Sequence, residues 1–327
     1  MKKYWILSVS VMLSSLFAVI FIGCGNDVVE SEMTDDEFIR YVVSSGYDND
    51  YNNDDNLVSQ DIEDLNDEGA LFNDNEPPTT SSYDSLYKWG RIITGVNRNT
   101  EITNEGDSLK NVVVNTTLNG NIIIIGYLSN VMDTTIKPFT KNTSRKVVFK
   151  RIANTDKPRR NWRLYKVSCL DGQTTQPELG SSKVRIDKIE IYRNGEPNPS
   201  YTLTGPDFNN IIFVTKLFGG AGLLQLDRNE VIKAKVYTTS QMTEIDYVAF
   251  HSSKRGFGHR RTLFDFESQT GSGPYNRIFS KDLIINGTHK LGAYNAHFSA
   301  TTHESFYEDD ISKFASDVVG IPFKVTR

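Results

Sequence analysis

From residue 112 onward the chain is a succession of short runs rich in Val, Ile, Thr, Tyr and Phe, separated by turn-forming residues. Runs of this kind predict β-strands, and short turns between them predict antiparallel neighbours. The strongest example is a pair of runs, 112–118 and 121–125, on either side of Asn119-Gly120. This dipeptide supplies the two positive φ angles of a tight hairpin turn. We therefore expect a mainly β chain with a hairpin at Asn119-Gly120.

The length of 327 residues favours more than one compact module, because a single apolar core rarely grows beyond about 250–300 residues. Residues 84–94 have apolar side chains along one helical stripe and precede the strands, so an α+β antiparallel module is expected over residues 83–222. The glycine-rich run 219–222 is the expected hinge. Residues 223–327 carry strand signals every 8–12 residues, which is typical of a β-sandwich. The strands expected in the two modules are 146–151, 162–169, 184–192, 201–204, 211–217, 231–237, 245–251, 261–266, 278–285, 291–300 and 318–325.

Two resemblances refine this fold class. The runs 146–151 and 161–166, separated by a short break, are similar to the adjacent strand pair of NTF2-like cone folds. The later residues include Leu263-Phe264-Asp265-Phe266, then Gly271-Ser272-Gly273-Pro274-Tyr275, then Phe279. This order resembles immunoglobulin-like modules of bacterial surface proteins, with Ser272 where that family has Asp. The resemblance implies an immunoglobulin-like β-sandwich over residues 223–327 with a spacing, bracing or binding role.

The N-terminus predicts export. Lys2 and Lys3 precede an apolar stretch that ends in Phe21-Ile22-Gly23-Cys24. This ending resembles the lipobox of bacterial lipoproteins, with Phe21 where the family usually has Leu. The resemblance implies a signal peptide over residues 1–23 and acylation of Cys24, which would anchor the chain to a lipid bilayer in the bacterial cell envelope. A cleaved soluble secretory protein and an uncleaved signal anchor are the alternatives.

Charge is distributed very unevenly along the chain. Residues 27–76 contain seventeen Asp and Glu against Arg40 alone, whereas the chain from Pro77 onward carries a net charge of +9. An acidic block poor in apolar residues repels itself, so residues 24–82 are expected to be a largely disordered linker that ends at Pro77-Pro78. One local exception is a short amphipathic helix after Thr34, with an acidic first turn and Gly46 at its end.

A basic run is the only sequence hint of a partner. Residues 137–166 contain eleven Lys and Arg against Asp156 alone, and four of them surround an expected hairpin tip beside Trp162. Such bases can bind phosphate or carboxylate groups. Anionic headgroups, lipopolysaccharide, acidic wall polymer and the chain's own acidic linker are the candidate partners, and a merely solvated rim is the alternative. Export argues against nucleic acid. The candidate anion-binding residues are Lys157, Arg159, Arg160 and Arg163.

The sequence carries no recognisable catalytic motif, and neither a cofactor nor a metal site is expected. His251 and His259 bracket one loop, but two ligands do not make a zinc site. His297 and His303 are expected to face solvent, and Cys169 to be a small buried apolar residue. The favoured function is a membrane-anchored envelope lipoprotein with a non-catalytic binding or structural role. An envelope hydrolase or small-ligand carrier with a pocket in residues 83–222 is the alternative.

Overall fold

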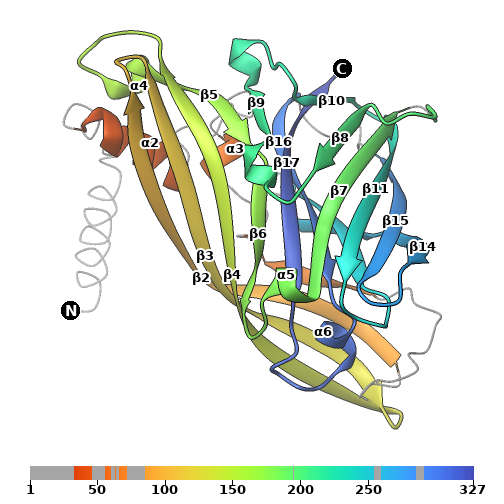
Figure 1. Cartoon of the computed structure of the whole chain (residues 1–327). Coiled ribbons are helices and arrows are strands. Elements are labelled where there is room, and N and C mark those ends of the chain that lie inside the picture. The colour runs from red at the N-terminus through yellow and green to blue at the C-terminus, as the bar shows by residue number, and fades with distance from the viewer. Residues whose placement is uncertain are drawn as a thin grey trace, which may run out of the picture.

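The structure, a computed structural model, describes residues 33–45, 56–59, 63, 66–71, 85–193, 195–253, 259–284 and 291–327. The predicted signal peptide, Cys24 and most of the acidic segment lie outside these residues. Figure 1 shows a mainly β molecule built from two sheets. The strand pairs are antiparallel, apart from the parallel pair β10 (Leu224–Asp227) and β17 (Ser316–Thr326). The mainly β fold class with antiparallel sheets is thus confirmed. In the described part, no helix combines the length and the apolar character needed to cross a bilayer.

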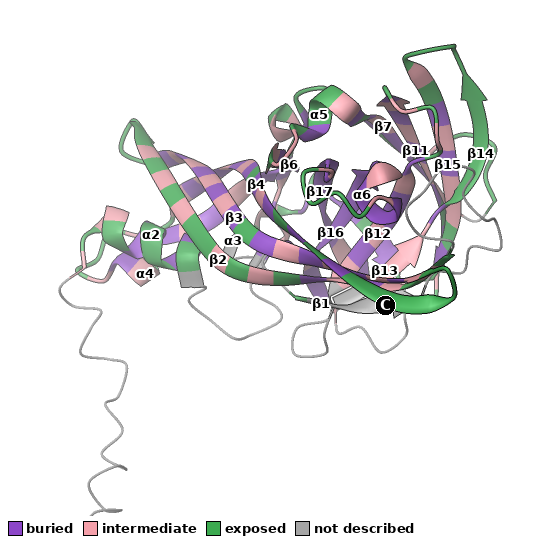
Figure 2. Cartoon of the chain, turned by 90° about the horizontal axis from the view of Figure 1, so that it is seen from below, coloured by how far each residue is buried: buried purple, intermediate pink, exposed green. Residues whose placement is uncertain are grey.

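The larger sheet has twelve strands within the described residues. Nine follow the path β1-β2-β3-β4-β6-β17-β16-β12-β13, while β5, β9 and β10 pair off it. The path curls, so that its end strands β1 and β13 lie in contact (Figure 2). The bounds of the other strands are β1 Asp67–Leu71, β2 Ser85–Glu105, β3 Leu109–Leu128, β4 Val131–Arg151, β5 Trp162–Ser168, β6 Leu170–Gln176, β9 Ile212–Val214, β12 Tyr247–Ser253, β13 His259–Leu263 and β16 Gly292–Thr301.

The smaller sheet has the order β14-β15-β11-β7-β8 and packs against the larger one. Val236 and Phe279 from the smaller sheet share a buried apolar core with Phe298 and Val319 from the larger sheet. β16 and β17 are therefore covered on both faces, and almost all their residues are buried. The bounds are β7 Val184–Arg193, β8 Tyr201–Thr204, β11 Val231–Ser240, β14 Asp265–Thr270 and β15 Tyr275–Ile284, with short helical turns α4 Pro158–Asn161, α5 Gly180–Lys183, η2 Phe208–Asn210, η3 Lys216–Phe218 and α6 Glu304–Tyr307.

The expected boundary at residue 222 does not coincide with a break in either sheet. β6 pairs with β17, and β7 pairs with β11, so each sheet joins strands from both sides of the glycine run. Gly219, Gly220 and Gly222 do adopt positive φ angles after η3. They turn the chain within one continuous body, because the strands before and after them bury their apolar faces in one shared core.

Asn119-Gly120 does not form a turn, which corrects the expected hairpin. β3 runs without interruption from Leu109 to Leu128, paired with β2 on one side and β4 on the other. The turn lies instead at Ser129-Asn130, where both residues have positive φ. Gly120 serves close packing: a Cβ on it would lie 2.8 Å from the Phe139 ring and 2.6 Å from the Ile92 carbonyl oxygen. Neighbouring strands on both sides override the local turn preference.

The helix expected over residues 84–94 is also wrong. Residues 85–94 belong to β2, which lies between β1 and β3. Trp89 and Arg91 are buried, whereas Ile92 is exposed. The spacing of Leu86, Trp89, Ile92 and Ile93 therefore does not correspond to one buried helical face. The α+β expectation depended on this helix, so these residues support a β assignment instead.

The helix expected after Thr34 is confirmed as α2 (Asp35–Ser45). The Thr34 amide donates to the Glu37 carboxylate at 2.8 Å, and the Glu37 amide donates to the Thr34 hydroxyl at 3.3 Å, which together form a capping box. The apolar side of α2, with Ile39 and Val42 fully buried, packs against the inner face of the larger sheet, together with α3 (Asn56–Ser59).

Glu63, from the same acidic segment, is buried inside the curled sheet. Its carboxylate accepts hydrogen bonds from Arg91 at 2.8 Å and Lys141 at 2.7 Å, and His297 Nδ1 lies 3.5 Å from its other oxygen. Burial alone would raise the pKa of Glu63, but Arg91, Lys141 and His297 hold it well below its usual value. The described parts of the segment 24–82 thus pack on the sheet, although an extended spacer was expected. α2 and α3 pack on the sheet through a few apolar side chains, and Glu63 is held there by ion pairs with buried bases.

Candidate functional site

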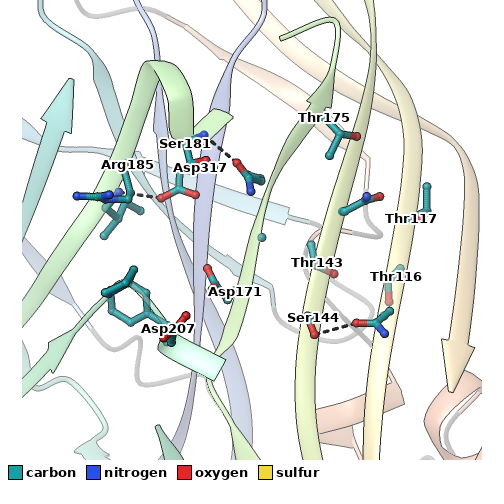
Figure 3. Close-up of a pocket in the computed structure, with 17 residues that line it drawn as sticks. Thr116, Thr117, Thr143, Ser144, Asp171, Thr175, Ser181, Arg185, Asp207 and Asp317 are labelled. Carbon is teal, nitrogen blue, oxygen red and sulfur yellow. Dashed lines mark hydrogen bonds between the residues drawn. The ribbon is translucent and has the colours of Figure 1, made fainter. Parts of the chain in front are cut away.

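A polar groove of about 600 Å³ lies on the outer face of the larger sheet, where it meets β7 and the turn before η2. β3 and β4 supply one wall, and β6 and β17 supply the opposite wall (Figure 3). Seventeen residues line it, and all but four have polar side chains. These are Asn115, Thr116, Thr117, Asn142, Thr143, Ser144, Asp171, Gln173, Thr175, Ser181, Arg185, Asp207 and Asp317, with Gly172, Ile186, Pro206 and Phe208 as the remainder.

One wall of the groove follows from strand alternation. Even-numbered residues of β3 and odd-numbered residues of β4 are buried on the inner face of the sheet. Asn115 and Thr117 of β3, and Asn142 and Ser144 of β4, therefore lie on the outer face. The Ser144 hydroxyl donates to Asn115 Oδ1 at 2.9 Å. This wall offers hydroxyl and amide groups, which both donate and accept hydrogen bonds.

The opposite wall carries carboxylates (Figure 3). Asp171 on β6 and Asp317 on β17 are diagonal neighbours, because Asp317 pairs with Gln173 and Asp171 with Val319. Asp207 is exposed at the groove edge. Gly172, between Asp171 and Gln173, allows β6 to approach β4 closely: a Cβ there would lie 2.6 Å from Thr143 Cγ2.

Both wall carboxylates resist ionisation. Burial raises the pKa of Asp317 to about 7, and the nearby Asp171 carboxylate contributes to this increase. The Ile186 amide, which donates to Asp317 Oδ2 at 2.7 Å, acts in the opposite direction and lowers the pKa. Burial likewise raises the pKa of Asp171 to about 6, helped by Asp207. The base on this wall, Arg185, is bound to Asp187 at 2.7 Å. Perturbed carboxyl groups that face a cavity are typical of functional sites.

The groove can bind a polar molecule through many hydrogen bonds, and its carboxylates favour neutral or positively charged molecules over anions. Cys169 is fully buried, as expected, and burial raises the pKa of its thiol to about 12, which disfavours the reactive thiolate. Among the described residues, no group of three or more His, Cys, Asp and Glu side chains is placed to hold a metal ion.

The structure divides the basic run between two faces of β4. Lys137, Lys141 and Arg145 point to the inner face and are buried. Lys137 donates to the carbonyl oxygens of Glu304 and Lys313, and burial lowers its pKa to about 8. These three bases stabilise the interior and are not available to an external partner. The expectation treated the run as one surface because a count of charges ignores strand alternation.

The four candidate anion-binding residues lie around α4, away from the groove. Arg160 is exposed, whereas Lys157, Arg159 and Arg163 are half-buried. The Arg163 guanidinium donates to the carbonyl oxygens of Arg159 and Trp162.

The acidic first turn of α2 reaches the same end of the sheet. Asp36 pairs with Lys110 at 2.5 Å, and Asp35 lies 3.8 Å from Arg151. Lys110 and Arg151 both lie over the Trp162 ring. Part of the acidic segment thus neutralises bases at this rim.

The histidine expectations need two corrections. His303 lies beyond the end of β16 and is half-buried, with its ring stacked on Tyr307. His297 lies fully buried beside Glu63. Because β16 is covered on both faces, the alternation of its side chains does not separate buried from solvent-exposed positions. His251 Nε2 is 2.7 Å from the Ser299 hydroxyl within the sheet. The side chain of His259 lies outside the described residues.

Sequence reasoning missed Asp171 and Asp317, which come from distant parts of the chain. Each had a local signal, because a single acid interrupts a strand-like apolar run: Cys169-Leu170 precede Asp171, and Val318-Val319 follow Asp317. A lone carboxyl inside a buried strand needs a partner or a function.

No protein-family model matches this chain, and neither the curated proteins nor the solved structures contain a match to it.

Proposed function

We propose that this chain is a lipid-anchored lipoprotein of the bacterial cell envelope whose folded body binds a small polar solute without transforming it. The observation that carries the binding role is the groove of about 600 Å³ with polar side chains on both walls. A groove of this size suits a small molecule. Its three carboxylates and single arginine select against anions.

The anchor rests on the sequence. Gly23-Cys24 at the end of the apolar N-terminal stretch supports acylation of Cys24 and attachment to a bilayer. Palmitate labelling of the wild type tests this directly, and Cys24→Ala is expected to abolish the label and to release the protein from membranes or leave an uncleaved precursor. An unlabelled wild type contradicts the anchor while leaving the groove untouched.

A solute screen tests the groove. Thermal denaturation of the full mature chain is measured with saccharides, amines and, as the negative class, dicarboxylates. Thr117→Trp fills the groove from an outward-facing position and is expected to abolish any stabilisation by solute. Thr103→Trp, an exposed position on β2, is the matched control and is expected to retain it. Stabilisation by dicarboxylates alone, or equal stabilisation of both variants, contradicts the proposal.

Envelope anions are proposed as a second partner at α4, where Arg160 is exposed and Lys157 and Arg159 are half-buried. Anionic headgroups, lipopolysaccharide and acidic wall polymer share this chemistry. The rim pairs between α2 and the sheet support competition by the chain's own acidic segment. Nucleic acid is not proposed, because the export signal directs the chain away from it.

An envelope hydrolase is the second candidate, favoured by two carboxyl groups of raised pKa that face one cavity. Such pairs perform general acid and base catalysis in many enzymes. A solute that binds the groove and is recovered chemically unchanged supports the binding role, whereas its conversion supports the hydrolase.

We also propose the two finer fold resemblances, to NTF2-like cone folds and to immunoglobulin-like modules. The antiparallel pair of β4 and β5 supports the NTF2-like resemblance of residues 83–222. The strands β11, β12, β15, β16 and β17 contribute to both layers of a two-sheet core, as the immunoglobulin-like resemblance of residues 223–327 implies, and β6 and β7 complete these layers.

A further inference from the structure

The carboxylate wall of the groove holds two partly desolvated carboxyl groups, Asp171 and Asp317, that have no matching cation among the described residues. Asp317 is only 6% exposed, and its side chain makes one hydrogen bond within the described residues, from the Ile186 amide to Oδ2. Its Oδ1 has no hydrogen bond there, and neither Asp317 nor Asp171 forms an ion pair with a described base. A desolvated carboxylate without a cation is unfavourable, so such a site gains free energy when a cation arrives.

The chain's own bases do not fill this role. Arg185 of β7 faces the groove but is bound to Asp187. The positive charge of Lys141 on β4 lowers the pKa of Asp317. The Lys141 ammonium itself, however, is bound to Glu63 on the inner face of the sheet. The remaining charged group at the groove is Asp207, which adds negative charge. Among the described residues, these carboxyl groups are therefore left to a proton or to a cation that a ligand brings.

The chemistry of the walls selects the kind of cation. The described residues offer no group of three carboxylates or imidazoles placed for a metal ion. An ammonium group donates three hydrogen bonds and needs acceptors rather than a closed coordination shell. Asp171 and Asp317 provide charged acceptors on one wall, and Asn115, Thr117 and Ser144 provide neutral acceptors across the groove (Figure 3).

We propose that the groove binds an aliphatic polyamine, with one ammonium group held between Asp171 and Asp317 and the chain lying along the hydroxyl and amide wall. This inference rests on the proposed solute-binding function and names its ligand class. The ammonium replaces the protons that the empty site keeps on these carboxyl groups, whose pKa values are raised to about 6 and 7. Binding therefore releases protons and strengthens as pH rises from 5 to 8.

Titration calorimetry of the full mature chain in 150 mM salt tests this. Spermidine and 1,4-diaminobutane are the probes, and 1,4-butanediol is the neutral counterpart of the diamine. Both amines stay charged over this pH range. We expect the diamine to bind at least tenfold more tightly than the diol at pH 8 and at least tenfold more weakly at pH 5 than at pH 8. Buffers of different ionisation enthalpy are expected to show net proton release at pH 6.5.

Variants separate the groove from general attraction to an acidic protein. Asp317→Asn keeps an acceptor for the Ile186 amide and is expected to lose the preference for the diamine over the diol, as is Asp171→Asn. Asp265→Asn, an exposed carboxylate on β14, is the matched control and is expected to bind like the wild type. Thr117→Trp is expected to abolish binding.

Equal affinity for diamine and diol, or amine binding that survives Asp317→Asn and Thr117→Trp, overturns the polyamine assignment. If another solute binds and Thr117→Trp blocks it, the proposed function stands while this inference fails. The failure of every solute to bind in the groove overturns both.

Discussion

Asparagine in place of Asp317 is expected to stabilise the folded chain at alkaline pH. The carboxyl of Asp317 is buried between β6 and β7 and accepts one backbone hydrogen bond, which an Asn side chain can also accept. The wild-type side chain must ionise in this setting, and its burial raises its pKa from 3.8 to about 7. The substitution removes the ionisation while keeping the shape.

The sign follows from proton binding. The unfolded chain loses the proton of residue 317 near pH 4, whereas the folded state keeps it up to about pH 7. The stability that this group contributes is therefore complete below pH 4 and is lost as pH rises to 7. A shift of about three pKa units corresponds to about 4 kcal/mol. Since Asp171 contributes to the shift and can itself take up a proton, we expect Asp317→Asn to gain about 2–4 kcal/mol over wild type at pH 8.

Urea denaturation at pH 4.5, 6 and 8 measures this difference. The stabilisation by Asp317→Asn is expected to be about 1 kcal/mol or less at pH 4.5, to grow through pH 6 and to level off above pH 7. Asp265→Asn, whose wild-type side chain is 75% exposed, serves as the control and is expected to show no such trend. A difference between Asp317→Asn and wild type that does not change with pH would refute the assignment of a buried, proton-holding carboxyl.

Three further changes probe other parts of the account. Glu63→Gln removes the charge that pairs with Arg91 and Lys141, so it is expected to cost about 3–5 kcal/mol in urea denaturation, and a cost below 1 kcal/mol contradicts the buried network. Gly120→Ala places a methyl group against the Phe139 ring and is expected to lower the free energy of unfolding by about 1–3 kcal/mol. Gly95→Ala, where the nearest atom is 3.9 Å away, is the control and should be nearly neutral. Equal effects of the two substitutions argue against the continuous strand β3. Replacing the four α4 bases by Ser is expected to weaken cosedimentation with anionic vesicles by about 2–3 kcal/mol at low salt, because each base near an anionic surface contributes about 1 kcal/mol and Arg163 already donates to two carbonyl oxygens. Salt-insensitive binding that the change leaves intact points to a solvated rim. The four bases are Lys157, Arg159, Arg160 and Arg163.

Local signals in the sequence predicted local structure well. The helix after Thr34 formed because its capping box and apolar spacing lie within one short segment. The strands expected over residues 184–192 and 201–204 also formed, as β7 and β8, and they pair with each other. In contrast, the Asn119-Gly120 turn preference was overridden, since long strands on both sides extend β3 through it. Partners that are distant in the chain decide whether such a signal is used.

The candidate site depended on contacts that sequence spacing does not reveal. Asp171 and Asp317 become neighbours only because β17, the last strand of the chain, pairs with β6. The basic run looked like one surface, yet strand alternation buried Lys137 and Lys141 of β4, while Arg160 is exposed on α4. Side-chain alternation wrongly predicted an exposed His297, because β16 is covered on both faces. Residue types predicted the chemistry, whereas the sheet order decided which groups face a common space.

Amide hydrogen exchange of the full mature chain, with and without the solute that stabilises it most, tests the central claim that the groove is the binding site. Exchange slows where a ligand suppresses local opening. The account predicts slower exchange in β6, in α5 and around residues 206–208, which border the groove, with β14 unchanged as an internal control. Slower exchange confined to β14 or the α4 region, with β6 and α5 unaffected, would contradict it.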